Sequence, residues 1–155
     1  MRRLPLLILA AVLAGALALS ASATSPPTTT LQFLGVSSNY NFTGSPNPNA
    51  PPKLGDLFSF QITLYKWSGD KRGSMSGGVS VLGVALSSSM NSVSAVATLP
   101  GGTLVIEGNS GNGRGVLLAV TGGTGSYAGA RGEVITRNIG GPNSSKSGIT
   151  IRLWQ

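Results

Sequence analysis

Short runs of β-favouring residues, separated by glycine, asparagine, serine and proline, make up the chain from Thr30 onward. No segment in this part carries the 3.6-residue apolar period that marks an amphipathic helix. The runs are spaced as in hairpins and leave no room for the crossover helices that parallel strands need. The sequence therefore predicts antiparallel all-β structure. The eight expected strands are 30–36, 56–67, 74–86, 92–99, 103–107, 115–121, 132–139 and 148–154.

The clearest strand is 56–67, because its apolar and polar residues alternate as in a strand with one buried face. The segment 115–121 is apolar on both faces, so we expect it to be deeply buried. Residues 37–54 are expected to form a loop, with 39–42 as a short extension of the first strand. Proline-rich sequence inside that loop cannot pair in a central ladder, because proline lacks the backbone N–H.

Two architectures fit eight short antiparallel strands, a closed barrel and an open two-sheet sandwich. The glycines inside 74–86 suit the sharp bends of a barrel. Closure also removes exposed sheet edges. An eight-stranded barrel has an interior that is filled by side chains or holds one small ligand. The favoured prediction is an all-β, eight-stranded antiparallel closed barrel, and the sandwich is the alternative.

The first 23 residues have the three-part pattern of a secretory signal peptide. Met1-Arg2-Arg3 is basic, the run to Leu19 is almost wholly apolar, and Ala21-Ser22-Ala23 is a small-x-small cleavage site. The alternative is a membrane anchor, but a spanning helix needs roughly 20 apolar residues and this run is shorter. We therefore expect a secreted protein without stable membrane insertion after cleavage. The predicted organisation is signal peptide 1–23, flexible linker 24–30 and a single barrel domain 31–155.

The sequence contains neither cysteine nor histidine. An exported protein without disulfides is held together by packing and sheet hydrogen bonds. Without histidine, a Ser-His-Asp triad and an ordinary zinc site are excluded, and we predict no metal and no cofactor. The formal net charge is +7, but the basic residues are scattered. Nucleic-acid-binding proteins concentrate such charge in a patch, so no nucleic-acid partner is predicted.

A glycine-rich run, VTGGTGSYAGARG, occupies residues 120–132. Gly122, Gly123 and Gly125 allow positive φ angles, so the backbone can reverse tightly after a buried strand. Tyr127 can pack its ring while its hydroxyl stays hydrated or hydrogen-bonded. Such a loop can also cradle phosphate, but this one leads into a strand and no lysine follows it. We interpret the run as a tight turn between two strands.

This run resembles the signature of the dirigent and allene oxide cyclase-like barrel superfamily, in which a Gly-Gly-Thr-Gly turn and an aromatic precede Ala-Arg-Gly. The resemblance covers about residues 31–154 and is strongest in the second half. It implies an eight-stranded antiparallel barrel with an apolar cavity, often assembled as a trimer. The implied partners are a small apolar or phenolic ligand and other copies of the chain, as a homotrimer or homodimer. Family members steer a cyclisation or a radical coupling, largely by confinement.

The chain departs from plant dirigents at positions where those proteins carry an acidic pair and an arginine. It has Gln61 and Ile62 in place of the acids and Asn109 in place of the arginine. Radical coupling of the plant kind is therefore not expected. The hypothesis is a secreted barrel that binds a small hydrophobic or phenolic molecule and steers its cyclisation or coupling. Whether it is an enzyme, isomerase-like or dirigent-like, stays open, and the alternative is a non-catalytic module that binds a ligand or glycan.

Glu107 and Tyr127 are the candidate catalytic residues. Glu107 would stabilise a developing cation if it projected into a cavity, and the alternative is an outward, solvated carboxylate. Tyr127 would donate a proton, and the alternative is packing. Glu133 is expected to form a cross-strand ion pair, and Asp56 to be exposed. The candidate ligand-binding residues are Phe58, Phe60, Tyr65 and Arg131, and the motif-loop residues are Gly122, Gly123 and Gly125.

Overall fold

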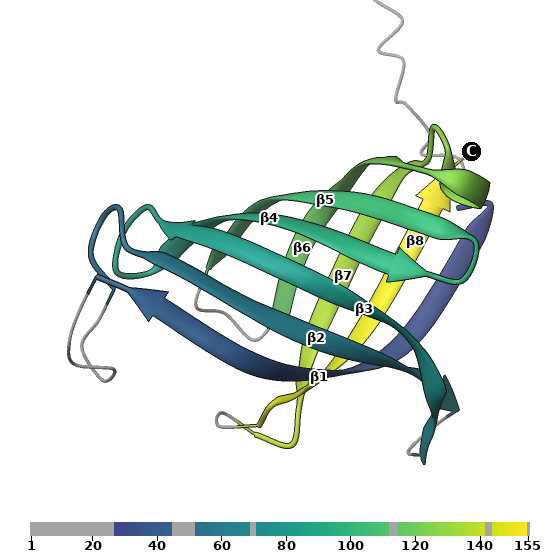
Figure 1. Cartoon of the computed structure of the whole chain (residues 1–155), viewed down its shortest axis with the longest axis horizontal. Helices are drawn as coiled ribbons and strands as arrows, with labels where there is room; N and C mark the ends of the chain where they lie inside the picture. The colour runs from purple at the N-terminus through teal and green to yellow at the C-terminus, as the bar shows by residue number, and fades with distance from the viewer. Residues whose placement is uncertain (1–26, 45–51, 69–70, 112–114, 142–143, 155) are drawn as a thin grey trace, which may run out of the picture.

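Eight antiparallel strands close into one ring in chain order (Figure 1). The computed structural model describes residues 27–44, 52–68, 71–111, 115–141 and 144–154. The first and last strands complete the ring by pairing with each other, so the predicted closed barrel is confirmed and the sandwich is not formed. The elements are β1 (Thr29–Thr43), β2 (Leu57–Ser68), β3 (Lys71–Ala85), β4 (Met90–Leu99), β5 (Gly102–Gly111), β6 (Gly115–Gly123), the short 3-10 helix η1 (Gly125–Tyr127), β7 (Arg131–Ile139) and β8 (Lys146–Trp154).

The segment before the barrel is only partly described. The predicted signal peptide, residues 1–23, lies outside the described residues, so that prediction is untested. β1 begins at Thr29, so the end of the predicted linker is already part of the barrel wall. Within the described ranges, no helix is long and apolar enough to cross a bilayer.

β1 continues through a β-bulge into the segment predicted as a loop, and it includes the short extension expected at 39–42. The strand register shifts between Ser38 and Asn41, and Asn39 has a φ angle of 53°, a left-handed conformation that asparagine tolerates. The Asn39 amide also donates a hydrogen bond to Gln61 Oε1 at 3.0 Å. The extra residue reverses the inward–outward alternation, so Phe33 points inward before the bulge and Tyr40 does so after it.

The predicted burial of both faces of residues 115–121 is wrong. Leu118 and Val120 are buried in the barrel, whereas Leu117 between them is 61% exposed. A barrel wall is a single layer, so alternate residues of every strand face outward whatever their polarity. β6 therefore has one buried face, as the other strands do.

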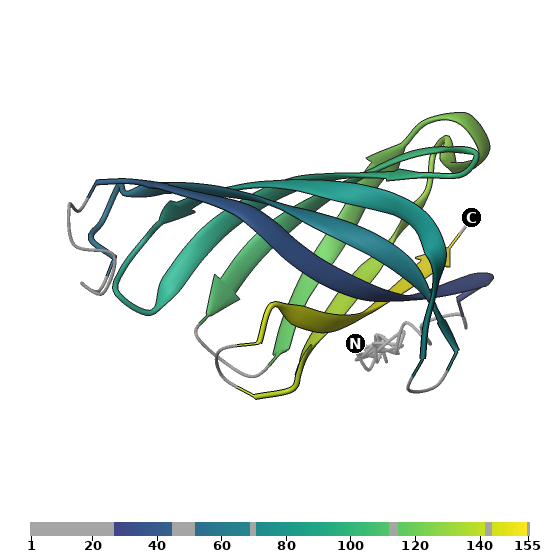
Figure 2. The same ribbon diagram turned by 60° about the horizontal axis from the view of Figure 1, so that its bottom comes forward.

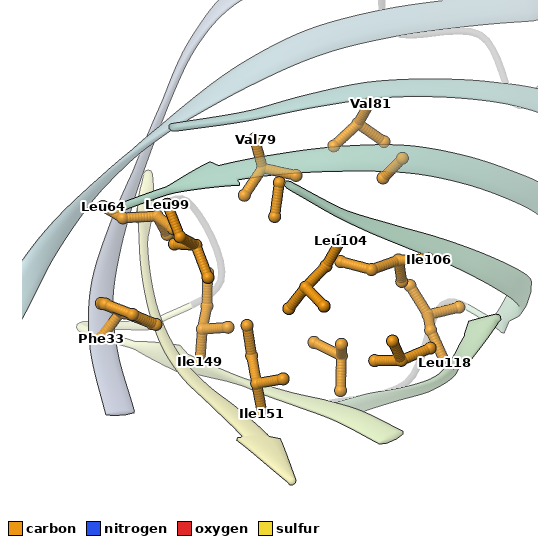
Figure 3. Packing of buried hydrophobic residues seen from close by; sticks show 14 of the residues in the cluster. Phe33, Leu64, Val79, Val81, Leu99, Leu104, Ile106, Leu118, Ile149 and Ile151 are labelled. Carbon is orange, nitrogen blue, oxygen red and sulfur yellow. The ribbon is translucent and has the colours of Figure 1, made fainter. Parts of the chain in front are cut away.

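The packed part of the interior lies at the end of the barrel formed by the β4–β5 and β6–β7 connections. Leu64, Leu104 and Leu153 are fully buried there, with Leu99 and Ala130 beside them. Figure 3 shows Leu64, Leu99 and Leu104 projecting inward. Burying one such side chain contributes about 2 kcal/mol. This end of the barrel is closed by side chains.

Two carboxylates, those of Asp56 and Glu133, form specific interactions within the fold. Asp56 was expected to be exposed, but it is 9% exposed and its Oδ2 accepts a hydrogen bond from the Lys53 backbone N–H at 2.7 Å. A carboxylate can be buried when it is hydrogen-bonded in this way. The expected cross-strand ion pair of Glu133 is confirmed, because Arg152 lies opposite it and donates to its Oε1 at 2.8 Å.

Candidate functional site

A pocket of about 290 Å³ lies inside the barrel at the end opposite the packed leucines, and all eight strands contribute to its lining. This volume is near the lower limit of ligand pockets, which range over roughly 300–1,000 Å³. Its deeper wall consists of aliphatic side chains that alternate with outward residues on their strands. These residues are Ile62, Val79, Val81, Val93, Ala95, Ile106, Val116, Leu118, Val134, Ile149 and Ile151.

One side of the pocket is aromatic. The rings of Tyr40 and Phe60 are stacked, with centroids 4.9 Å apart and planes inclined by 3°. Phe58 continues the row, 6.2 Å from Phe60. Its ring lies where a side chain at position 83 would project, so Gly83 is what makes room for it. Phe58 and Phe60 thus lie in the pocket wall, which is where a role in ligand binding requires them to be.

The pocket becomes polar toward its mouth. On β4 the inward residues run from Ala95 through Val93 to Asn91, and on β8 from Ile151 through Ile149 to Ser147. Among the described residues that line the pocket, none carries a charged side chain. We call the hydroxyl and amide residues at the mouth the polar collar; they are Ser37, Asn91, Ser110, Thr136 and Ser147.

Tyr40 adds one further hydroxyl near the mouth. The residue is 66% exposed, yet desolvation raises the pKa of its phenol. The hydroxyl is therefore protonated at neutral pH and able to donate a hydrogen bond. The mouth offers neutral donors and acceptors, which suit hydroxyl or carbonyl groups.

Three other predicted site residues lie on the outside of the barrel. Glu107 is exposed on the outer face of β5, because its neighbour Ile106 points into the pocket. The guanidinium of Arg72 stacks over the ring of Tyr65 at 3.6 Å, and Tyr65 does not line the pocket. Arg131 is exposed and donates to the backbone oxygen of Ala130 at 3.0 Å. Their predicted roles stay hypotheses, and these positions give them no support.

Tyr127 and the motif loop lie at the closed end of the barrel, away from the pocket. The Tyr127 side chain packs against the core, and its hydroxyl donates to the Pro100 backbone oxygen at 3.2 Å. Of the three motif glycines, Gly125 alone has a positive φ, 60°. Gly123 is required for a different reason: a Cβ there would lie 2.7 Å from the Thr103 backbone oxygen and against that of Tyr127.

We expect Tyr127→Phe to lower the free energy of unfolding by about 1 kcal/mol, the usual contribution of one hydrogen bond. Urea denaturation measures the change. Tyr65→Phe is the matched control, because the cation–π contact of Tyr65 uses its ring and the expected change is about 0.5 kcal/mol or less. An equal or larger effect of the control would contradict this assignment of the Tyr127 hydroxyl.

Reasoning from the sequence missed Tyr40 and the polar collar. Phe33 and Tyr40 are an odd number of residues apart, so simple alternation places them on opposite faces of β1. Only the bulge at Asn39 shows that both point inward. Serine, threonine and asparagine near strand ends are also typical of turns, so the collar was not distinguishable from turn chemistry. Among the described residues, no group of acidic side chains is placed to hold a metal ion.

The closed eight-stranded barrel has the same fold as solved structures of dirigent proteins and Diels-Alderases. Solved structures with this fold include a pyocyanin demethylase, at 20% identity and a TM-score of 0.64, covering 81% of this chain and 100% of that one. A pterocarpan synthase dirigent protein has 15% identity and a TM-score of 0.63, with coverage of 81% and 82%. The Diels-Alderase AbmU from Streptomyces koyangensis has 14% identity and a TM-score of 0.60, with coverage of 86% and 72%.

No protein-family model and no curated protein sequence matches the chain. At these identities the structural likeness establishes the fold. It confirms the barrel type to which the glycine-rich motif pointed.

Proposed function

We propose that this protein binds a small, uncharged, largely apolar or phenolic molecule in the inner pocket and steers its cyclisation or coupling by confinement. The observation that carries the proposal is the pocket itself, with aliphatic walls, an aromatic side and a neutral polar collar. A charged ligand would lose its hydration there without meeting an opposite charge. An uncharged molecule with one polar end matches the lining.

The lining also orients such a molecule. Its apolar part would lie against Ile106 and Ile149, and its hydroxyl or carbonyl would face the collar, near Asn91 and Thr136. Holding a reactive molecule in one geometry can lower a barrier by several kcal/mol without any acid or base. Related folds support this reading, because they include a dirigent protein and a Diels-Alderase.

The cellular setting of the proposal rests on the sequence alone. The pattern of residues 1–23 supports export followed by cleavage. Assembly into a homotrimer or homodimer is implied by the family resemblance.

Filling the pocket tests the proposal. Ala95 is 4% exposed and lines the pocket, so Ala95→Phe would place a ring in the ligand's space. We expect wild-type protein to bind 2-naphthol, a small planar phenol, in isothermal titration calorimetry. We expect Ala95→Phe to bind it at least about tenfold more weakly, a loss of about 1.4 kcal/mol.

Ala119→Phe is the matched control, because Ala119 is exposed on the outer face of β6. It makes the same substitution without changing the pocket and should leave the affinity unchanged. Equal weakening by both variants, or undiminished binding by Ala95→Phe, would show that the phenol binds elsewhere.

A further inference from the structure

A second hollow, of about 760 Å³, lies on the outside of the barrel over β1, β8 and β7. These three strands are adjacent in the ring, with β8 (yellow in Figure 1) between the other two. The outward residues of the strands form its floor, whereas the inward residues of the same strands line the inner pocket. We call this hollow the outer groove, and it is separated from the inner pocket by the barrel wall.

The strand register arranges the groove floor in rows. In the central row Gln32, Thr150 and Ile135 are direct cross-strand neighbours. One row beyond, Thr30 lies opposite Arg152. On the other side, Gly148 lies opposite Arg137. Hydroxyl, amide and guanidinium groups are thus spread over one continuous surface.

Trp67, near the end of β2, forms a wall of the groove. Its indole lies directly over Gly148, because a Cβ at that position would be only 2.5 Å from the ring. Any side chain at position 148 would displace the indole. In Figure 2, the ends of β2 and β3 that carry Trp67 and Arg72 extend beyond the ring. Because Gly148 has no side chain, the indole of Trp67 can pack on the sheet at this position, beside the polar residues of the groove floor.

The charge of the groove is unbalanced. Arg152 and Arg137 both line it, but Arg152 is paired with Glu133 at 2.8 Å. Arg137 is exposed at the opposite end of the floor. The two guanidinium-bearing positions are separated by four residues along the sheet, about 13 Å at roughly 3.3 Å per residue. The floor therefore presents one net positive charge within a longer surface of neutral hydrogen-bonding groups.

We propose that the outer groove binds an acidic saccharide. The indole of Trp67 offers a flat apolar surface for the C–H face of a sugar ring. Gln32, Thr30 and Thr150 supply donors and acceptors for ring hydroxyls. Arg137 supplies a charge-assisted hydrogen bond to one carboxylate. The length of the floor suits an oligosaccharide better than a single sugar.

Calorimetric titration with trigalacturonate, and with its fully methylated ester as the uncharged counterpart, tests this proposal. We expect wild-type protein to bind the acid, and the ester about tenfold more weakly. Arg137→Gln should weaken acid binding by about tenfold, in line with the loss of a hydrogen bond to a charged group, and leave ester binding unchanged. Acid binding should also weaken as salt is raised, because the charges are at the surface.

Lys53→Gln is the matched control, because it removes one exposed positive charge outside the groove and should leave both affinities unchanged. Trp67→Leu should weaken the acid and the ester alike. If that variant fails to fold, Arg137→Gln still decides the outcome. Absence of acid binding, equal effects of Arg137→Gln and Lys53→Gln, or equally tight binding of tripolyphosphate would each overturn the proposal. Ala95→Phe should not alter acid binding, which separates this site from the inner pocket.

Discussion

Leu104→Ala is expected to lower the free energy of unfolding by about 3 kcal/mol, within the range measured for buried leucines. Leu104 is fully buried at the closed end of the barrel. Its neighbours Ala97 and Gly123 lie on the flanking strands and have no larger side chain to fill the space. Urea denaturation followed by circular dichroism measures the loss.

Leu117→Ala is the matched control, because it removes the same atoms from a position that is 61% exposed. Its effect should stay within about 0.5 kcal/mol, as is usual at the surface. A loss similar to that of Leu104→Ala would contradict the solvent-exposed position of Leu117.

Gly123→Ala should destabilise the protein by about 1–3 kcal/mol, the usual range for overpacking. Two backbone oxygens, of Tyr127 and Thr103, occupy the space that the new methyl group needs. Backbone atoms cannot move aside as the end of a flexible side chain can. β5, β6 and η1 would have to separate locally, and thermal and urea denaturation should both record the loss.

Gly122→Ala, one residue earlier in the same motif, should be nearly neutral. A Cβ at Gly122 meets nothing within 4 Å, and this glycine does not have a positive φ angle. Replacing glycine at such a position can even stabilise a protein, by about 0.4–1 kcal/mol, because the unfolded chain loses freedom. Equal destabilisation by the two substitutions would contradict the close-approach explanation of Gly123.

The strand pattern and the closed ring could be predicted because they depend on alternation and connection length, which are local. A short extension at 39–42 was expected, but the bulge at Asn39 and its hydrogen bond to Gln61 could not be predicted. A single residue in a left-handed conformation leaves no periodic signal. The burial of Asp56 was missed for a similar reason, since its partner is the backbone N–H of Lys53, which no side-chain pattern reports.

The part of the candidate site on β2 could be predicted, because the alternation of apolar and polar residues decides which side chains of that strand point inward. Phe58 and Phe60 share the face of the fully buried Leu64, so their inward placement followed. Tyr65 lies beside register shifts between β2 and β3 and stacks under Arg72 instead. Glu107 was left open between inward and outward positions, because the face of a strand that lines a barrel is known only once its neighbours are paired. The outer groove depends on three strands and Trp67 together, so no single segment indicated it.

Every pair of neighbours in the ring is consecutive along the chain except β1 and β8. The barrel can therefore assemble hairpin by hairpin, and each step closes only a short loop. The final seam joins Thr28 to Leu153 by a 2.8 Å backbone hydrogen bond and closes a loop of almost the whole domain. Because the entropy of loop closure grows only logarithmically with length, joining the two ends of the domain costs only about 2 kcal/mol more than closing a single hairpin loop.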